Sequence, residues 1–217
     1  MAAAETMRND AGDLYRLPHR ALRSAMAQGL ADLQAARAEH DPQPLLARWQ
    51  ALADLLRSQM RCESEVLHAA LEARWPGSSW RSGLARDASC ARLDDLMLEL
   101  RQLARTPAAG RGPLLERLTR HARELVAQQR RQMAEQEALD APALALAYPG
   151  SAALLLLQRL LARLHEDEQA ALLHWMRQAL DPAALRRVAQ ALEAVGANAQ
   201  GPQITSLSHP TLKRETP

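Results

Sequence analysis

Apolar residues recur every three or four positions along most of this chain, which is the spacing of one face of an α-helix. The pattern predicts a first helix over about 18–39 and a second over about 44–75, which ends at Pro76-Gly77. A third helix is expected after Ser79 and leads to a loop at 106–112, and Pro113 opens a fourth. The inward positions of the first helix are His19, Leu22, Met26 and Leu33.

Polar residues interrupt two of these apolar faces. In the second predicted helix the face reads Leu45, Trp49, Leu52, Leu56, Gln59, Glu63, Val66 and Ala70. In the fourth it reads Leu115, Leu118, Ala122, Leu125, Gln129, Gln132, Gln136 and Leu139. Residues one turn apart project side by side, so such pairs on facing helices would converge inside a helical bundle, where metal sites are often built. Amides, however, are poor metal ligands.

Short connections make neighbouring helices antiparallel, so we expect an up-down-up-down four-helix bundle over 14–148. Amphipathic segments over about 151–165 and 166–180, and a last helix from Asp181-Pro182 to Gly196, predict a helical appendage over 149–196. The HEDE run at 165–168 is expected to open a helix with first-turn acids. We expect disorder over 1–13 and in the polar, aperiodic tail over 197–217.

Composition supports an all-α fold, because Ala and Leu are abundant while Phe is absent and Gly is scarce. The net charge of +2 comes from 27 basic and 25 acidic residues mixed along the chain, so nucleic-acid binding is not expected. The most apolar stretch, 152–157, is too short to span a bilayer, and the first residues lack the apolar core of a signal peptide. We therefore expect a cytoplasmic protein, in which Cys62 and Cys90 are free thiols.

Several stretches resemble the hemerythrin-like (HHE cation-binding) family of bacterial helical bundles. LYRLPHRALR is similar to the first-helix histidine motif of that family, and CESEVLHAALEARWPG to the stretch that carries a His-x3-Glu ligand pair. The spacing through ARLDDLMLEL to QMAEQEALDAPALALAY extends the resemblance over about 14–148. The resemblance implies a four-helix bundle with a non-heme diiron site that binds oxygen, nitric oxide or related small species.

The resemblance retains only some of the ligands. His19, Glu63 and Glu137 match ligand positions, but Gln59 and Gln132 stand where histidines are expected. Gln136 stands where an acidic residue often occurs, and the third helix offers only Cys90 and Asp87 or Asp94. Two irons present about ten to twelve coordination positions, far more than these groups supply. The sequence therefore predicts a largely decayed diiron site, with His19, Glu63 and Glu137 as its vestige, and no cofactor.

The polar residues have two interpretations. The glutamines Gln59, Gln129, Gln132 and Gln136 either form a network in the former metal volume or line a small polar cavity, since unpaired buried amides are costly. The acids Glu63 and Glu137 are stabilised by these amides or by an arginine, for which Arg61, Arg130 and Arg131 lie near in sequence. If both acids face the core unpaired, at least one should have a raised pKa. His68, His121, His165 and His174 show no metal spacing and are expected to be structural or surface residues.

No phosphate-binding glycine loop or nucleophile with an identifiable base is present. The function that the sequence favours is a non-catalytic binding or regulatory module with a protein partner, without nucleic acid or membrane. The first alternative is a metal-binding member that binds or senses oxygen, nitric oxide or iron through His19, Glu63 and Glu137. The second is a thiol redox sensor that uses Cys62 and Cys90.

Overall fold

The computed structural model describes residues 10–186, 188, 189 and 193. Every regular element within these residues is a helix, which confirms the prediction of an all-α protein for this part of the chain. Within the same residues, no helix combines the length and the apolar composition needed to cross a membrane. The elements are α2 (Asp10–Ala35), α3 (Gln43–Cys62), the π-helix η1 (Glu63–His68), α4 (Ala69–Arg74), α5 (Trp80–Arg105), the 3-10 helix η2 (Ala108–Gly110), α6 (Arg111–Ala147), α7 (Ser151–Ala162) and α8 (Glu166–Ala179).

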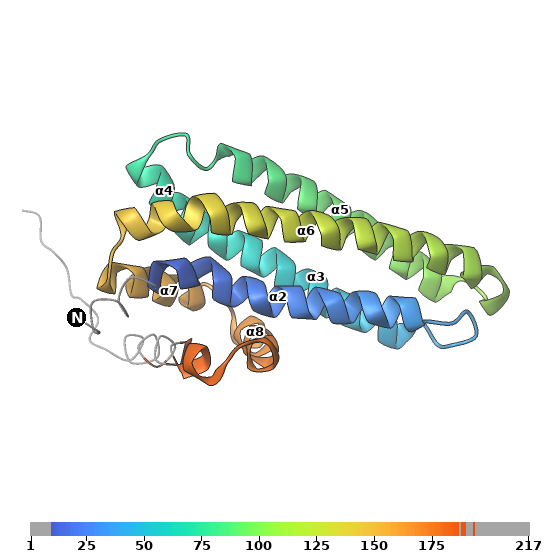
Figure 1. Ribbon diagram of the computed structural model, residues 1–217. Coiled ribbons are helices and arrows are strands. Elements are labelled where there is room, and N and C mark those ends of the chain that lie inside the picture. The colour runs from blue at the N-terminus through green and yellow to red at the C-terminus, as the bar shows by residue number, and fades with distance from the viewer. Residues whose placement is uncertain (1–9, 187, 190–192, 194–217) are drawn as a thin grey trace, which may run out of the picture.

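The long helices lie side by side and the chain reverses direction at each connection between them (Figure 1). Contacts join α2 to α6 and α3, and join α5 to α3 and α6, so each long helix has two long neighbours. Helices α7 and α8 pack against α2, while α7 also contacts η1 and α8 contacts α3. Helices α7 and α8 therefore cover one side of the helical body near the first half of α2 (Figure 1).

Two helices contain a proline within their length, and one of these, Pro18, was expected to begin its helix. Helix α2 begins at Asp10, so that Pro18 lies inside it, and α6 continues beyond Pro142 to Ala147. A proline removes one backbone donor and crowds the preceding turn, which usually bends or ends a helix. In both helices the apolar face continues across the proline, through Leu14 and Tyr15 in α2 and through Ala141 and Leu144 in α6. Burial of these side chains offsets the local cost of the proline. Residues 10–13 are thus helical, whereas the rest of the segment expected to be disordered lies outside the described residues.

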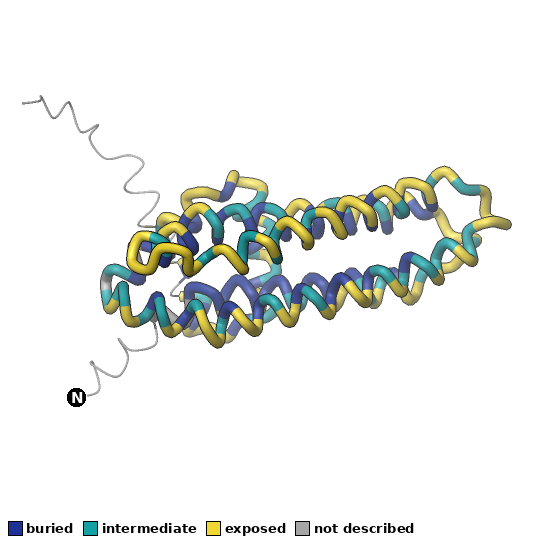
Figure 2. The backbone as a smooth tube through the Cα atoms, turned by 90° about the horizontal axis from the view of Figure 1, so that it is seen from above, coloured by how far each residue is buried: buried dark blue, intermediate teal, exposed yellow. Residues whose placement is uncertain are grey.

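Buried residues line the inward sides of the long helices (Figure 2). The inward face predicted for 44–75 is confirmed from Leu45 to Val66, including the polar members Gln59 and Glu63, and only Ala70 at its end is partly exposed. Helices α2 and α3 approach closely at Gly29, where a Cβ atom would lie 2.9 Å from Leu52 Cδ2. Small side chains at such crossings let helices pack tightly.

Beyond Gln129 the predicted face of α6 is confirmed at Gln136 and wrong at Gln132 and Leu139. Leu139 is 66% exposed and Gln132 is only half-buried, whereas Met133 and Gln136 are buried. After Gln129 the next buried residues are Met133 and Gln136, at spacings of four and three. The predicted inward residues were Gln132 and Gln136, at spacings of three and four. Both sequences of steps agree with a helical period, so the sequence pattern alone does not choose between them.

A π-helix interrupts the second long helix between α3 and α4, where the sequence predicted one uninterrupted α-helix. Its backbone hydrogen bonds join residues five apart, rather than four apart as in an α-helix. Glu63 and His68 stand at its two ends and are both buried. Such segments are frequent at functional sites, because they rotate the side chains that follow.

The C-terminal helices follow the predicted pattern. Helix α8 has Glu166, Asp167 and Glu168 in its first turn, as expected, and the Glu168 carboxylate accepts a hydrogen bond of 2.8 Å from the backbone N–H of His165. Residues 182–186 are helical after Asp181-Pro182, which confirms the start of the last predicted helix. Its expected end at Gly196 and the tail over 197–217 lie outside the described residues.

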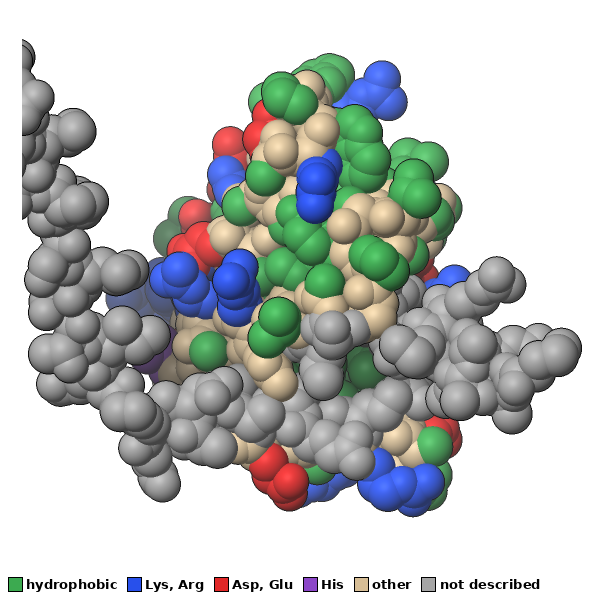
Figure 3. Space-filling model, turned by 90° about the vertical axis from the view of Figure 1, so that its left-hand side faces the viewer, with side chains coloured by type: hydrophobic (Ala, Val, Ile, Leu, Met, Phe, Trp, Pro, Cys, Tyr) green, Lys and Arg blue, Asp and Glu red, His purple; other side chains and the backbone are tan. Residues whose placement is uncertain are grey.

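Apolar side chains lie exposed at the end of the molecule where α4 and α6 end (Figure 3). Trp75 follows α4 directly and is 40% exposed, and Leu146 in the last turn of α6 is 78% exposed. Basic side chains are interspersed among them on this face (Figure 3).

Candidate functional site

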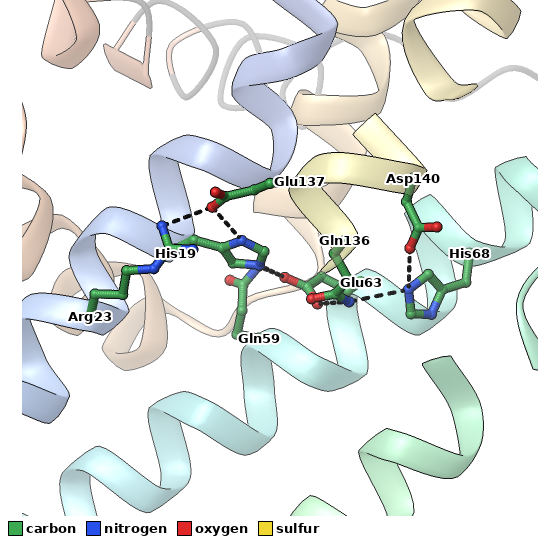
Figure 4. A network of polar contacts seen from close by, with 8 residues as sticks. All are labelled: His19, Arg23, Gln59, Glu63, His68, Gln136, Glu137 and Asp140. Carbon is green, nitrogen blue, oxygen red and sulfur yellow. Dashed lines mark hydrogen bonds and ion pairs between the residues drawn. The ribbon is translucent and has the colours of Figure 1, made fainter. Parts of the chain in front are cut away.

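The imidazole of His19 lies between two carboxylates inside the helical body (Figure 4). Its Nε2 is 3.0 Å from Glu63 Oε1 at the start of η1, and its Nδ1 is 2.9 Å from Glu137 Oε1 on α6. His19 is 1% exposed, and the ring of Tyr15 lies one turn earlier on α2 at a centroid distance of 5.5 Å. The three residues that were expected to be the vestige of a metal site are therefore brought together in space.

This geometry determines the protonation state of His19. An ionised carboxylate oxygen only accepts hydrogen bonds, so both ring nitrogens must carry protons and the ring is an imidazolium. Burial lowers the pKa of His19, but Glu63 and Glu137 outweigh burial and raise the pKa above its ordinary value. The buried cation and its two acids thus stabilise one another in their charged forms.

Glu63 is the most enclosed acid of the group, with 3% of its surface exposed. Its Oε1 accepts hydrogen bonds from His19 and from Gln59 Nε2 at 2.9 Å, and its Oε2 accepts one from Gln136 Nε2 at 3.1 Å. Burial raises the pKa of Glu63, but the charge and hydrogen bond of His19, together with the Gln59 amide, lower the pKa below its ordinary value. The expectation that amides stabilise this acid is confirmed for Gln59 and Gln136.

Glu137 lies nearer the surface and has a second cationic partner. Arg23 Nη1 is 2.9 Å from the same Oε1 that binds His19. Burial raises the pKa of Glu137, but the hydrogen bonds from His19 and Arg23 lower it to about 2. The arginines named from the sequence are not the partners of these acids. Arg61 pairs with Glu65 and Glu168 instead. Arg130 and Arg131 are exposed. The missed signal was local, since Arg23 stands one helical turn after His19 on the same face of α2.

A second histidine extends this network on its other side. His68 Nε2 accepts a hydrogen bond of 3.4 Å from Gln136 Nε2 and lies 3.9 Å from Asp140 Oδ2 (Figure 4). Burial lowers the pKa of His68 and raises that of Asp140. The sequence assigned His68 to the structural or surface residues, and its burial in this network agrees with the structural option. The π-helix that places His68 there has no local sequence signature, so the sequence pattern could not predict this contact.

The glutamines do not form one network. Gln59 and Gln136 contact Glu63, but Gln132 accepts a hydrogen bond of 3.1 Å from the buried Ser89 on α5. Gln129 is buried and its Nε2 has no partner within the described residues. Of the two interpretations of Gln59, Gln129, Gln132 and Gln136, the single network is therefore wrong for Gln129 and Gln132. Gln132 and Gln136 both line one surface cleft. The different rotation of α6 beyond Gln129 accounts for the position of Gln132.

The donor set does not fit the diiron centre that the family resemblance implies. A metal needs the lone pair of a neutral imidazole, but both nitrogens of His19 are directed at carboxylate oxygens. The oxygens of Glu63 receive N–H groups of His19, Gln59 and Gln136, and such groups would be repelled by a cation. Within the described part of the chain, no group of three or more His, Cys, Asp and Glu side chains is arranged to hold a metal ion.

Both cysteines are free thiols. Cys62 is fully buried beside Glu63 in the sequence, and burial raises its pKa to about 11. A thiol with such a pKa is almost entirely protonated at neutral pH and reacts slowly with oxidants. Cys90 on α5 is partly exposed. The environment of Cys62 thus does not favour the redox-sensor alternative.

The polar centre is therefore a network of Arg23, Glu137, His19, Glu63, Gln59, Gln136, His68 and Asp140 that links α2, α3, η1 and α6 (Figure 4). We call these eight residues the central network. Comparisons of the chain with protein-family models, with curated proteins and with solved structures give no match, so the site is interpreted from its own geometry.

Proposed function

We propose that this chain is a non-catalytic binding or regulatory module built on a hemerythrin-like four-helix bundle, in which the central network replaces the two irons. The observation that carries the proposal is the pairing of both His19 nitrogens with Glu63 and Glu137. A histidine that serves as a metal ligand keeps one nitrogen free of protons and directs it at the metal.

The charges of the central network support a structural role for it. Arg23 and the imidazolium of His19 carry two positive charges, which balance the negative charges of Glu137 and Glu63. Each of these side chains is held by at least one of the others at hydrogen-bond distance. Acid and base groups that act on a substrate are instead directed at the reacting atoms. The network joins three segments far apart in the sequence and so fixes how α2, η1 and α6 pack.

The proposal is tested by anaerobic reconstitution of the purified protein with ferrous iron, followed by measurement of bound metal and of the absorption spectrum after exposure to air. We expect bound iron far below one atom per chain, no oxo-bridge absorption, and no difference between the wild type and a His19→Leu variant. Two irons per chain with oxo-bridge absorption, both lost in His19→Leu, would refute the proposal and establish the metal-binding alternative.

A further inference from the structure

A cleft of about 660 Å³ lies between the first turns of α5 and the second half of α6. Gln136 and Asp140 of the central network line it, together with Trp80, Arg81 and Leu139. Its size is in the range of clefts that hold small molecules. The cleft thus connects the buried polar centre with the surface of the protein.

One wall of the cleft is apolar and exposed. Trp80 is 59% exposed on α5, and Leu139 is 66% exposed on α6. Large apolar side chains grouped at the mouth of a cleft are typical of a surface that contacts a ligand.

The polar lining of the cleft offers hydrogen-bond acceptors. Gln136 is 4% exposed and uses its Nε2 for Glu63 and His68, while its Oε1 has no hydrogen-bond partner among the described residues. The side chain of Asp140 is 20% exposed, and its nearest basic group is His68 at 3.9 Å. Burial lowers the pKa of His68, so this histidine is neutral at pH 7. No lysine or arginine within the described residues pairs with the Asp140 carboxylate.

A carboxylate beside an amide oxygen binds a group that donates hydrogen bonds and carries a positive charge. The guanidinium of Arg81 lies over the indole ring of Trp80, 5.5 Å from its centroid, so this ring offers the ligand an apolar contact rather than a second cation site. Glu135, another residue lining the cleft, is exposed and adds negative charge. Arg81 is itself exposed, so water screens its repulsion of a cation near Asp140.

We propose that this cleft binds a small organic cation, in which a primary ammonium or amidinium group contacts Asp140 and Gln136 and an attached aromatic or apolar group packs on Trp80 and Leu139. The inference goes beyond the proposed function and does not depend on it. Iron reconstitution measures bound metal and absorption, whereas this site is tested by ligand binding to the metal-free protein. The failure of one proposal is therefore distinguishable from the failure of the other.

The test is calorimetric titration of the full chain with three probes of similar shape: phenethylammonium, 2-phenylethanol and phenylacetate. We expect the ammonium to bind measurably and the neutral alcohol and the anion to bind at least about tenfold more weakly, because only the cation pairs with Asp140. Equal affinity for all three probes, or no detectable binding of the ammonium at millimolar concentration, would overturn the proposal.

Two variants locate the site, with a third as a matched control. Asp140→Asn should weaken binding of phenethylammonium about tenfold, and Trp80→Ala should weaken it roughly threefold. Glu116→Gln removes an exposed carboxylate from α6 outside the cleft and should change affinity little. Trp80 is exposed, so its variant keeps the fold and tests the site even if Asp140→Asn does not fold. Unchanged affinity in Trp80→Ala would place the probe elsewhere and refute the proposal.

Discussion

Replacing His19 by leucine removes the only cation among the described residues that contacts the buried Glu63. Glu137 keeps Arg23 at 2.9 Å, so most of the cost falls on Glu63, which retains only the neutral donors Gln59 and Gln136. Glu63 then either remains charged without a counter-ion or takes up a proton. Its ordinary pKa is 4.5, so holding it protonated at pH 7 costs about 1.4 kcal/mol per pH unit, or roughly 3 kcal/mol. Loss of the hydrogen bonds brings the expected destabilisation to about 3–5 kcal/mol.

A second substitution distinguishes this charge effect from a simple packing defect. Glu63→Gln alone should destabilise the protein, because it removes a charged partner of His19. In the His19→Leu background the same substitution should be neutral or stabilising, because it removes a buried charge that has lost its counter-ion. Urea unfolding followed by circular dichroism at pH 7 measures all four members of this cycle. Additive losses in the double variant would refute the argument.

The same unfolding measurement at several pH values checks the sign of the charge effect. The pKa of His19 is raised, so its contribution is complete below its ordinary pKa of 6.5 and is lost as pH rises through the folded-state pKa. The pKa of Glu63 is lowered, so its contribution is present above 4.5 and is lost as pH falls through the folded-state pKa. The two groups together stabilise the wild type most between pH 4.5 and 6.5. His121→Leu, at a part-exposed His–Glu pair of 3.0 Å, is the matched control and should cost less than about 1 kcal/mol.

Three further outcomes are expected. Arg23→Met should lower the free energy of unfolding in urea by only about 1 kcal/mol, because Glu137 keeps its bond to His19 and is partly exposed; a loss as large as that of His19→Leu would contradict this. Gly77→Ala should lower it by about 1 kcal/mol, since Gly77 has φ +83 with open space around it, and an unchanged value would show that no strain is introduced. In a thiol-labelling assay of the native protein, Cys90 should react first, and Cys62 should react in a Cys90→Ser variant only as fast as the protein unfolds, because burial raises the pKa of Cys62 to about 11. Rapid labelling of native Cys62 would contradict that expectation.

The sequence predicted the helices and much of the core because both depend on spacing along a single segment. A buried face of Leu45, Trp49 and Leu52 follows from the fixed number of residues in each helical turn. The inward position of His19 among apolar residues is determined in the same way. Pro18 was misleading as a boundary, because burial of side chains on both sides of this proline outweighs its local cost.

The tertiary structure decided which polar side chains meet. His19 contacts one acid 44 residues away and another 118 residues away, and these contacts depend on the rotation and offset of three helices. The rotation of α6 brings Gln136 to Glu63 and takes Gln132 to Ser89, and the π-helix brings His68 into the central network. The sequence by itself therefore determined that charged and amide groups would lie in an apolar core. Only the packing of the helices decided that both nitrogens of His19 face carboxylates, because these acids are distant in the chain. The protonation state of His19 depends on these neighbours and so was also decided by the tertiary structure.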